Sequence, residues 1–155
     1  MFLLLSHLLL PATAMSAQNP DAKGCIADLQ RFVGGHWEGK QGNEAVSIRF
    51  ESSDEGQSIR GVGKVIIDGK TTLTIDTRYG WDENAHLTYY LGARGHDIVY
   101  YGHVIGARGV LKTHFTNLCN PLQTFDLTEK FVNDDTVESK LANQKDKLVL
   151  TRIKD

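Results

Sequence analysis

Apolar and polar residues alternate along most of the chain, which is the pattern of strands that bury one face. In the segment VSIRFE, for example, Val46, Ile48 and Phe50 share one face and polar residues occupy the other. The alternation predicts about ten strands, at residues 36–40, 46–51, 58–68, 71–81, 86–91, 96–105, 110–117, 123–131, 136–141 and 148–153. Their short connections favour hairpins between strands that follow one another in the chain.

One early segment has a helical period instead. Residues 25–33 place their apolar side chains three and four positions apart, which forms one face of a helix. The glycine pair Gly34-Gly35 follows, as is usual at the C-terminal end of a helix. The sequence therefore predicts one short N-terminal helix before the strands.

About ten strands in one sheet need a way to avoid open edges, and closure is the most direct one. Hairpin connections between consecutive strands favour an all-β, up-and-down antiparallel barrel, with a two-sheet sandwich as the alternative. The glycines Gly61 and Gly63 within one long strand fit the sharp bend that a barrel corner requires.

The tetrapeptide Gly-Ala-Arg-Gly occurs twice, at residues 92–95 and 106–109, and predicts two similar tight turns. If these turns set Leu91 opposite His96 and Ile105 opposite Val110, strict alternation assigns every side chain of the three strands to a face. The more apolar face should line the interior; it includes Tyr89, Tyr100, Thr113 and Phe115. The other face carries His86, Tyr101, His103 and His114, and we expect it to be solvated.

The N-terminus has the pattern of a targeting segment. Residues 2–10 are almost entirely apolar but too few to span a membrane, and small residues follow Pro11. This predicts a signal peptide at residues 1–17, cleaved after Ala14 or Ala17, and a barrel domain at residues 18–155. No Lys or Arg precedes the apolar run, which is atypical. A signal peptide implies a periplasmic or secreted protein.

Length, charge and cysteine content limit the alternatives. The chain of 155 residues has the size of one domain, and its net charge of -2 argues against a nucleic-acid partner. The two cysteines, Cys25 and Cys119, predict a disulfide in an exported protein; two unpaired cysteines are the alternative.

A family resemblance rests on three short motifs. The helix is followed by Phe-Val-Gly-Gly-His-Trp-Glu-Gly at residues 32–39, then Tyr-Gly-Trp-Asp at residues 79–82, and the last strand ends in Leu-Thr-Arg-Ile at residues 150–153. This arrangement resembles the bacterial lipocalin-like domains of the calycin superfamily. The resemblance implies a small-molecule pocket inside the barrel. It also implies a structural motif of Gly35, Trp37 and Arg152, in which the arginine stacks over the indole.

The chemistry that the sequence itself indicates is binding rather than catalysis. It contains no His-Glu-x-x-His, Cys-x-x-Cys or nucleophile-elbow motif, so we predict no catalytic residue, metal or cofactor. We expect a small hydrophobic or amphipathic ligand inside the barrel. The residues that we predict to contact it are Phe50, Ile75, Tyr79, Tyr89, Tyr100, Thr113 and Phe115.

Three alternatives stay open at this point. Inward-facing His103 and His114 would favour a barrel enzyme such as an isomerase, cyclase or hydrolase. A haem- or metal-binding barrel is another, although related haem barrels use a histidine near the end of the chain and the last one here is His114. The third is a barrel filled by its own side chains. The oligomeric state is open.

Overall fold

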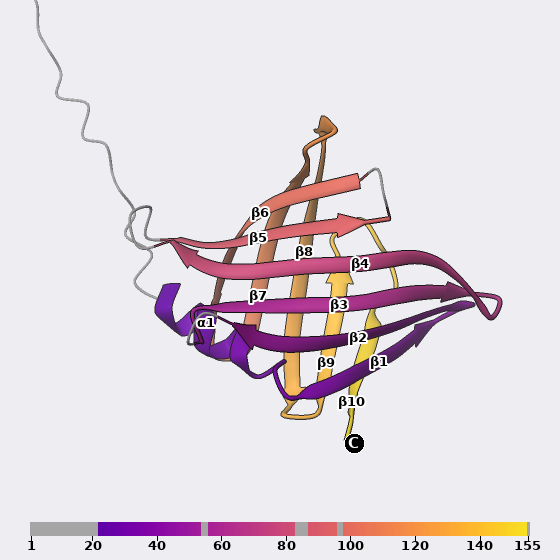
Figure 1. Ribbon diagram of the computed structural model, residues 1–155, viewed down its shortest axis with the longest axis horizontal. Coiled ribbons are helices and arrows are strands. Elements are labelled where there is room, and N and C mark those ends of the chain that lie inside the picture. The colour runs from indigo at the N-terminus through magenta and orange to yellow at the C-terminus, as the bar shows by residue number, and fades with distance from the viewer. Residues whose placement is uncertain (1–21, 54–55, 83–86, 96–97, 155) are drawn as a thin grey trace, which may run out of the picture.

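The chain forms a closed antiparallel barrel behind one helix (Figure 1). The computed structural model describes residues 22–53, 56–82, 87–95 and 98–154; the predicted signal peptide lies outside them. The elements within the described residues are α1 (Ala22–Gln30), β1 (Gly35–Gln41), β2 (Glu44–Ser53), β3 (Ser58–Ile67), β4 (Lys70–Asp82), β5 (Leu87–Arg94), β6 (Ile98–Ala107), β7 (Val110–Asn117), β8 (Asn120–Asn133), β9 (Thr136–Leu141) and β10 (Leu148–Ile153). Every strand pairs with its chain neighbours, and β1 pairs with β10. The predicted up-and-down barrel is confirmed over the sandwich.

The two ends of the barrel are different. Helix α1 lies at the end where β2 and β4 finish and β3 begins, and it packs against β3 to β7 (Figure 1). We call this the closed end. The opposite end, which carries the β1–β2, β3–β4, β5–β6, β7–β8 and β9–β10 connections, is called the far end.

The helix begins and ends earlier than the predicted residues 25–33. After Gln30 the backbone tightens into three successive i→i+3 hydrogen bonds, from the amides of Arg31, Phe32 and Val33. This tighter turn continues the apolar period without α-helical geometry, which explains why the pattern extended too far. Gly34 follows with a φ of +78°, in the left-handed region that ends the turn.

The two Gly-Ala-Arg-Gly copies do not form similar turns. In the second copy Arg108 and Gly109 both have positive φ, at 57° and 78°, as a two-residue hairpin turn with the favoured twist requires. In the first copy Gly92–Arg94 still belong to β5, and the connection to β6 begins only at Gly95. The same four residues therefore adopt different structures in different tertiary surroundings.

This difference changes the register of β5. Leu91 lies opposite Tyr101 instead of His96, a shift by an odd number of residues that turns every side chain of β5 to the other face. Ile105 lies opposite Lys112 instead of Val110, a shift by two that leaves the faces of β6 and β7 as predicted. The expectation that Tyr89 faces the interior is therefore wrong, and its neighbour Tyr90 faces inward.

Candidate functional site

The closed end is sealed by a tightly packed aromatic cluster. Trp37 has no exposed surface, and its Nε1 donates a hydrogen bond of 2.8 Å to the carbonyl oxygen of Phe32. The Phe32 ring lies 5.4 Å from Trp37, 4.8 Å from Phe50 and 4.8 Å from Phe131, centroid to centroid. Offset and edge-to-face ring contacts of this kind add to the free energy of burial. Phe50, predicted as a ligand contact, is thus part of this cluster.

Arg152 ties the last strand to the connection between α1 and β1. Its guanidinium lies 4.6 Å from the centroid of Trp37, so the expected stacking is present. Nη1 donates to the carbonyl oxygen of Val33 at 3.0 Å, and Nη2 donates to that of Arg31. A Cβ at position 35 would lie 2.7 Å from Cγ of Arg152, which explains why Gly35 stands there. These three residues form a structural lock at the closed end.

The interior toward the far end is lined by a second set of rings. Tyr79 contacts Tyr90 at 5.1 Å, Tyr90 contacts Phe115 at 5.8 Å, and Phe115 contacts both Tyr100 at 5.4 Å and Phe125 at 5.8 Å. The rings of Tyr90, Phe115 and Phe125 remain half-buried although they face inward, as does the side chain of Ile75. Solvent therefore reaches this half of the interior. We call Tyr79, Tyr90, Tyr100, Phe115 and Phe125 the interior aromatic chain.

A buried carboxylate lies in the same interior. Glu129 of β8 retains 6% of its surface, and its Oε2 is enclosed without a hydrogen-bond partner. Burial alone raises the pKa of this carboxyl to about 7. Among the described residues Glu129 is the one buried side chain of the Asp, Glu, Lys, Arg or His type. Burying an ionised carboxylate without a partner lowers the stability of the folded protein, so its presence here suggests a functional role.

A second unpaired polar atom lies beside this carboxylate. Thr113 of β7 retains 2% of its surface, and its Oγ1 also lacks a partner. Leu111 pairs with Glu129 and Thr113 pairs with Leu127, so Thr113 and Glu129 are diagonal neighbours on two adjacent strands. Both side chains face inward. We call Glu129 and Thr113 the interior polar pair.

The groups around the polar pair are neutral. Burial raises the pKa of the Tyr79 hydroxyl well above its ordinary value, and the charge of Glu129 adds to the effect. Burial likewise raises the pKa of Tyr90, and it raises the pKa of the Cys25 thiol to about 11. All three remain protonated near pH 7, so none of them compensates a charged Glu129.

Two cations share the inward-facing register, and both lie away from the polar pair. Arg152 is engaged at the closed end, where its Nε lies 3.3 Å from the Asp135 carboxylate. Arg94 is the last residue of β5, at the far end, opposite Ile75 and Ile98. Arg94 is half-buried and forms no ion pair among the described residues.

The sequence contained a signal for Glu129 that the prediction missed. Along β8 the inward positions are Phe125, Leu127, Glu129 and Phe131, so a carboxylate interrupts an otherwise apolar row. Asp126, a second acidic residue of this strand, occupies the opposite face. An acidic residue on the apolar face of a strand is the pattern that indicates a buried functional carboxylate.

The histidines do not enter the interior. His103 and His114 face outward as neighbours on β6 and β7, and Nδ1 of His114 lies 2.7 Å from the exposed Asp126 carboxylate. His86 lies outside the described residues. Across the described residues no group of three or more His, Cys, Asp or Glu side chains could hold a metal ion. The condition that favoured a histidine-based barrel enzyme is therefore not met by His103 and His114.

The predicted disulfide between Cys25 and Cys119 is wrong. Neither cysteine forms a disulfide, and Cys25 is buried whereas Cys119 is exposed. Cys25 belongs to α1, and the start of β7 lies at the same end, because the amide of Gly109 donates to Oδ2 of Asp28 at 2.9 Å. Cys119 follows the other end of β7, a strand of eight residues that spans roughly 25 Å. A disulfide requires Cα atoms less than about 7 Å apart.

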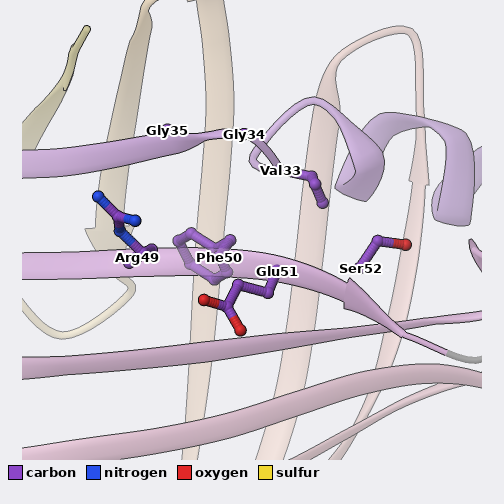
Figure 2. Close-up of a pocket in the computed structure, with 7 residues that line it drawn as sticks. All are labelled: Val33, Gly34, Gly35, Arg49, Phe50, Glu51 and Ser52. Atoms are coloured by element: carbon purple, nitrogen blue, oxygen red, sulfur yellow. The ribbon is translucent and has the colours of Figure 1, made fainter. Parts of the chain in front are cut away.

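Two hollows open on the outer surface. One of about 350 Å³ lies beside the α1–β1 turn, and Figure 2 shows Gly34 and Gly35 next to the stretch of β2 that carries Arg49, Phe50 and Glu51. The other, of about 390 Å³, lies over the outer face of β3 to β6, where Arg60 and Asp76 form an ion pair of 2.6 Å. The first is lined by side chains of both charges, and the second already contains a satisfied ion pair. Neither includes a buried polar atom without a partner within the described residues.

Comparison with known proteins adds no assignment. No protein-family model matches the chain, and no curated protein matches it. Among the described residues no helix is both long and apolar enough to cross a membrane. The function is therefore inferred from the interior of the barrel.

Proposed function

We propose that this protein binds a small amphipathic molecule inside its barrel, with access from the far end. The observation that carries the proposal is Glu129, a buried carboxylate whose Oε2 has no partner in the protein. Leaving a buried polar group unpaired costs about 1–3 kcal/mol, and more when the group is charged. A ligand that donates hydrogen bonds to the polar pair removes this cost on binding.

The surroundings support an amphipathic ligand rather than a purely polar one. The interior aromatic chain begins beside the polar pair, since Tyr90, Gly102, Phe115 and Phe125 form one row across β5 to β8. Thr113 and Leu127 occupy the next row toward the closed end, followed by Leu111 and Glu129. An apolar body packs against the rings while a polar head reaches the polar pair. Mostly apolar walls with a few placed polar groups are typical of small-ligand sites.

The membership in a lipocalin-like family and the export of the protein are part of the same proposal. The motifs at residues 32–39, 79–82 and 150–153 and the apolar residues 2–10 support them. The closed barrel is compatible with this family, but a barrel by itself does not identify one.

Native mass spectrometry tests the binding proposal. The full chain is expressed in a host that exports it, and native and denatured spectra are compared. We expect an organic mass that is present only in the native spectrum. Glu129→Gln should lose this mass, whereas Asp126→Asn, a matched change on the outer face of the same strand, should keep it. Equal occupancy in the two variants, or a wild type that retains no added small amphipathic probe, would overturn the proposal.

A second candidate is an enzyme that uses Glu129 as a general acid–base. A carboxyl whose pKa burial raises to about 7 suits proton transfer at neutral pH. The same spectra separate the two functions when the bound mass is followed over time. A ligand that stays unchanged supports binding, whereas a mass that is converted by the wild type and not by Glu129→Gln supports catalysis.

A further inference from the structure

Resting on the proposed ligand site, we infer that the ligand is a monoamine, whose ammonium group binds Glu129 and Thr113 and whose apolar body lies against the interior aromatic chain. The inference goes beyond an amphipathic ligand because it assigns the charge and the donors of the polar head. The inference follows from the charged side chains and the unpaired polar atoms in the interior of the barrel.

The first step is the charge. Glu129 faces inward with no cation beside it, since Arg152 bonds to carbonyl groups at the closed end and Arg94 lies at the far end. A neutral ligand leaves this carboxyl either protonated or charged and uncompensated. A cationic head neutralises the ionised carboxylate, and charge-assisted hydrogen bonds are roughly twice as strong as neutral ones.

The second step is the set of hydrogen-bond groups. Oε2 of Glu129 accepts hydrogen bonds when ionised, and Oγ1 of Thr113 accepts through its lone pairs; both lack partners. The two side chains are diagonal neighbours, so one compact donor group can reach both. An ammonium group is such a group, because its three N–H bonds point from a single atom.

The third step is the aromatic wall. Tyr79 is buried in the same interior as the carboxylate, and Tyr90 lies between Tyr79 and Phe115. The faces of such rings attract cations, and their area packs against an apolar chain. The polar pair and the rings thus favour the two parts of one amine.

The fourth step is the charge at the far end of the barrel, which disfavours a ligand with a second cationic group. Arg94 faces inward there and forms no ion pair among the described residues. A diamine long enough to span the rings would bring its second ammonium toward this guanidinium, and the repulsion in partly desolvated surroundings would weaken binding. The site therefore favours an amine at one end only.

Isothermal titration calorimetry of the full chain with four matched probes tests the inference: octylamine, octanol, octanoate and 1,8-diaminooctane. We expect octylamine to bind at least about tenfold more tightly than the other three, a difference of about 1.4 kcal/mol. Glu129→Gln should remove this preference without weakening octanol, and Asp126→Asn should leave all four affinities unchanged. Arg94→Gln should improve the binding of the diamine relative to octylamine.

Proton release gives an independent readout. Near pH 7 the Glu129 carboxyl is partly protonated, while Cys25, Tyr79 and Tyr90 remain neutral. Binding of an ammonium ionises the carboxyl, so the observed enthalpy should depend on the ionisation enthalpy of the buffer for the wild type and not for Glu129→Gln.

The failures of the inference and of the proposed function are distinguishable. Binding of octanol or octanoate as tightly as octylamine would overturn the amine inference and leave the ligand-binding function in place. Amine binding that survives Glu129→Gln would also overturn it. Failure of all four probes to bind would count against the function itself.

Discussion

The two ends of the barrel use the same kinds of side chain for opposite purposes. At the closed end Phe32, Trp37 and Phe131 are buried, and the polar atom of Trp37 has its partner in the Phe32 carbonyl. Toward the far end Phe115 and Phe125 are also inward-facing rings, but they stay half-buried. Between these two sets of rings the polar atoms of the interior polar pair are unpaired. At the closed end Nε of Arg152 forms no hydrogen bond, but it lies 3.3 Å from the Asp135 carboxylate, whereas the two enclosed atoms of the interior polar pair have neither a hydrogen bond nor an ion pair among the described residues.

This difference indicates where stability and binding are located. Well-packed, fully bonded regions contribute most to the free energy of unfolding, while binding regions retain groups that only a ligand satisfies. The lock of Gly35, Trp37 and Arg152 therefore holds the barrel shut at one end, and the interior polar pair lies between this lock and the half-buried rings toward the far end. Four predictions test this division, from the largest expected effect to the smallest.

The largest effect should come from Trp37→Ala at the closed end. Removing a side chain with no exposed surface leaves a cavity among Phe32 and Phe131, so we expect a loss of about 3–5 kcal/mol in the free energy of unfolding. Phe125→Ala in the far half should cost about half of that or less, because its ring is already half-buried. Urea unfolding of the two variants measures both values. Equal losses would contradict the division between the two ends.

The next effect is the pH dependence caused by Glu129. In the unfolded chain the carboxyl ionises near its ordinary pKa of 4.5, whereas burial raises the pKa to about 7 in the folded protein. The unfolded state therefore releases the proton first, and the free energy of unfolding should fall by about 3 kcal/mol as the pH rises between these two values. Above about pH 7 it should stay at the lower value.

Glu129→Gln should remove this fall, because the amide has nearly the same shape and does not titrate. The variant should be more stable than the wild type at about pH 8, and urea midpoints at both ends of the range measure the difference. Arg60 and Lys147 lower the pKa values of Asp76 and Glu138. These two carboxylates therefore change the free energy of unfolding below the pH range in which Glu129 titrates, and hardly within it. Parallel pH curves for wild type and variant would show that Glu129 is not buried as described.

A smaller effect should follow from Arg152→Met. The variant leaves the carbonyl oxygens of Arg31 and Val33 without their charged donor and removes the contact with Trp37, so we expect a loss of about 2–3 kcal/mol. Arg152→Lys should recover only part of it, because one ammonium cannot replace the planar guanidinium. Lys154→Met, at an exposed neighbour that pairs with Asp135 at 2.8 Å, should change stability by less than about 0.5 kcal/mol. Thermal denaturation of the three variants gives the order.

The smallest effect concerns the two thiols. We expect N-ethylmaleimide to label Cys119 in the native protein and both cysteines after unfolding, because Cys25 is buried and burial raises its thiol pKa to about 11. Cys119→Ser should change stability by less than about 0.5 kcal/mol, since Cys119 is exposed and forms no disulfide. Mass spectrometry counts the added groups, and a native protein without any reactive thiol would contradict an exposed Cys119 outside a disulfide.

Local pattern was sufficient for the elements of this fold and for several side-chain directions. Alternation in β2, β4 and β8 predicts strands because a period of two is a property of the chain itself. The directions of Tyr100, Thr113 and Phe115 followed from the same alternation and are inward, as expected. The prediction for Tyr89 was wrong because it depended on the register of the β5–β6 pair. That register was taken from two identical tetrapeptides, which adopt different structures.

The contact between Trp37 and Arg152 was implied by the family resemblance. The sequence by itself determined that the chain is all-β and that one helix precedes the strands. These conclusions depend on periods and spacings, which are local. The tertiary structure decided which face of β5 lines the interior, that Cys25 and Cys119 lie at opposite ends, and that Glu129 is buried without a partner. Register, separation and burial are set by the closure of ten strands around one interior, and no single segment of the chain contains that information.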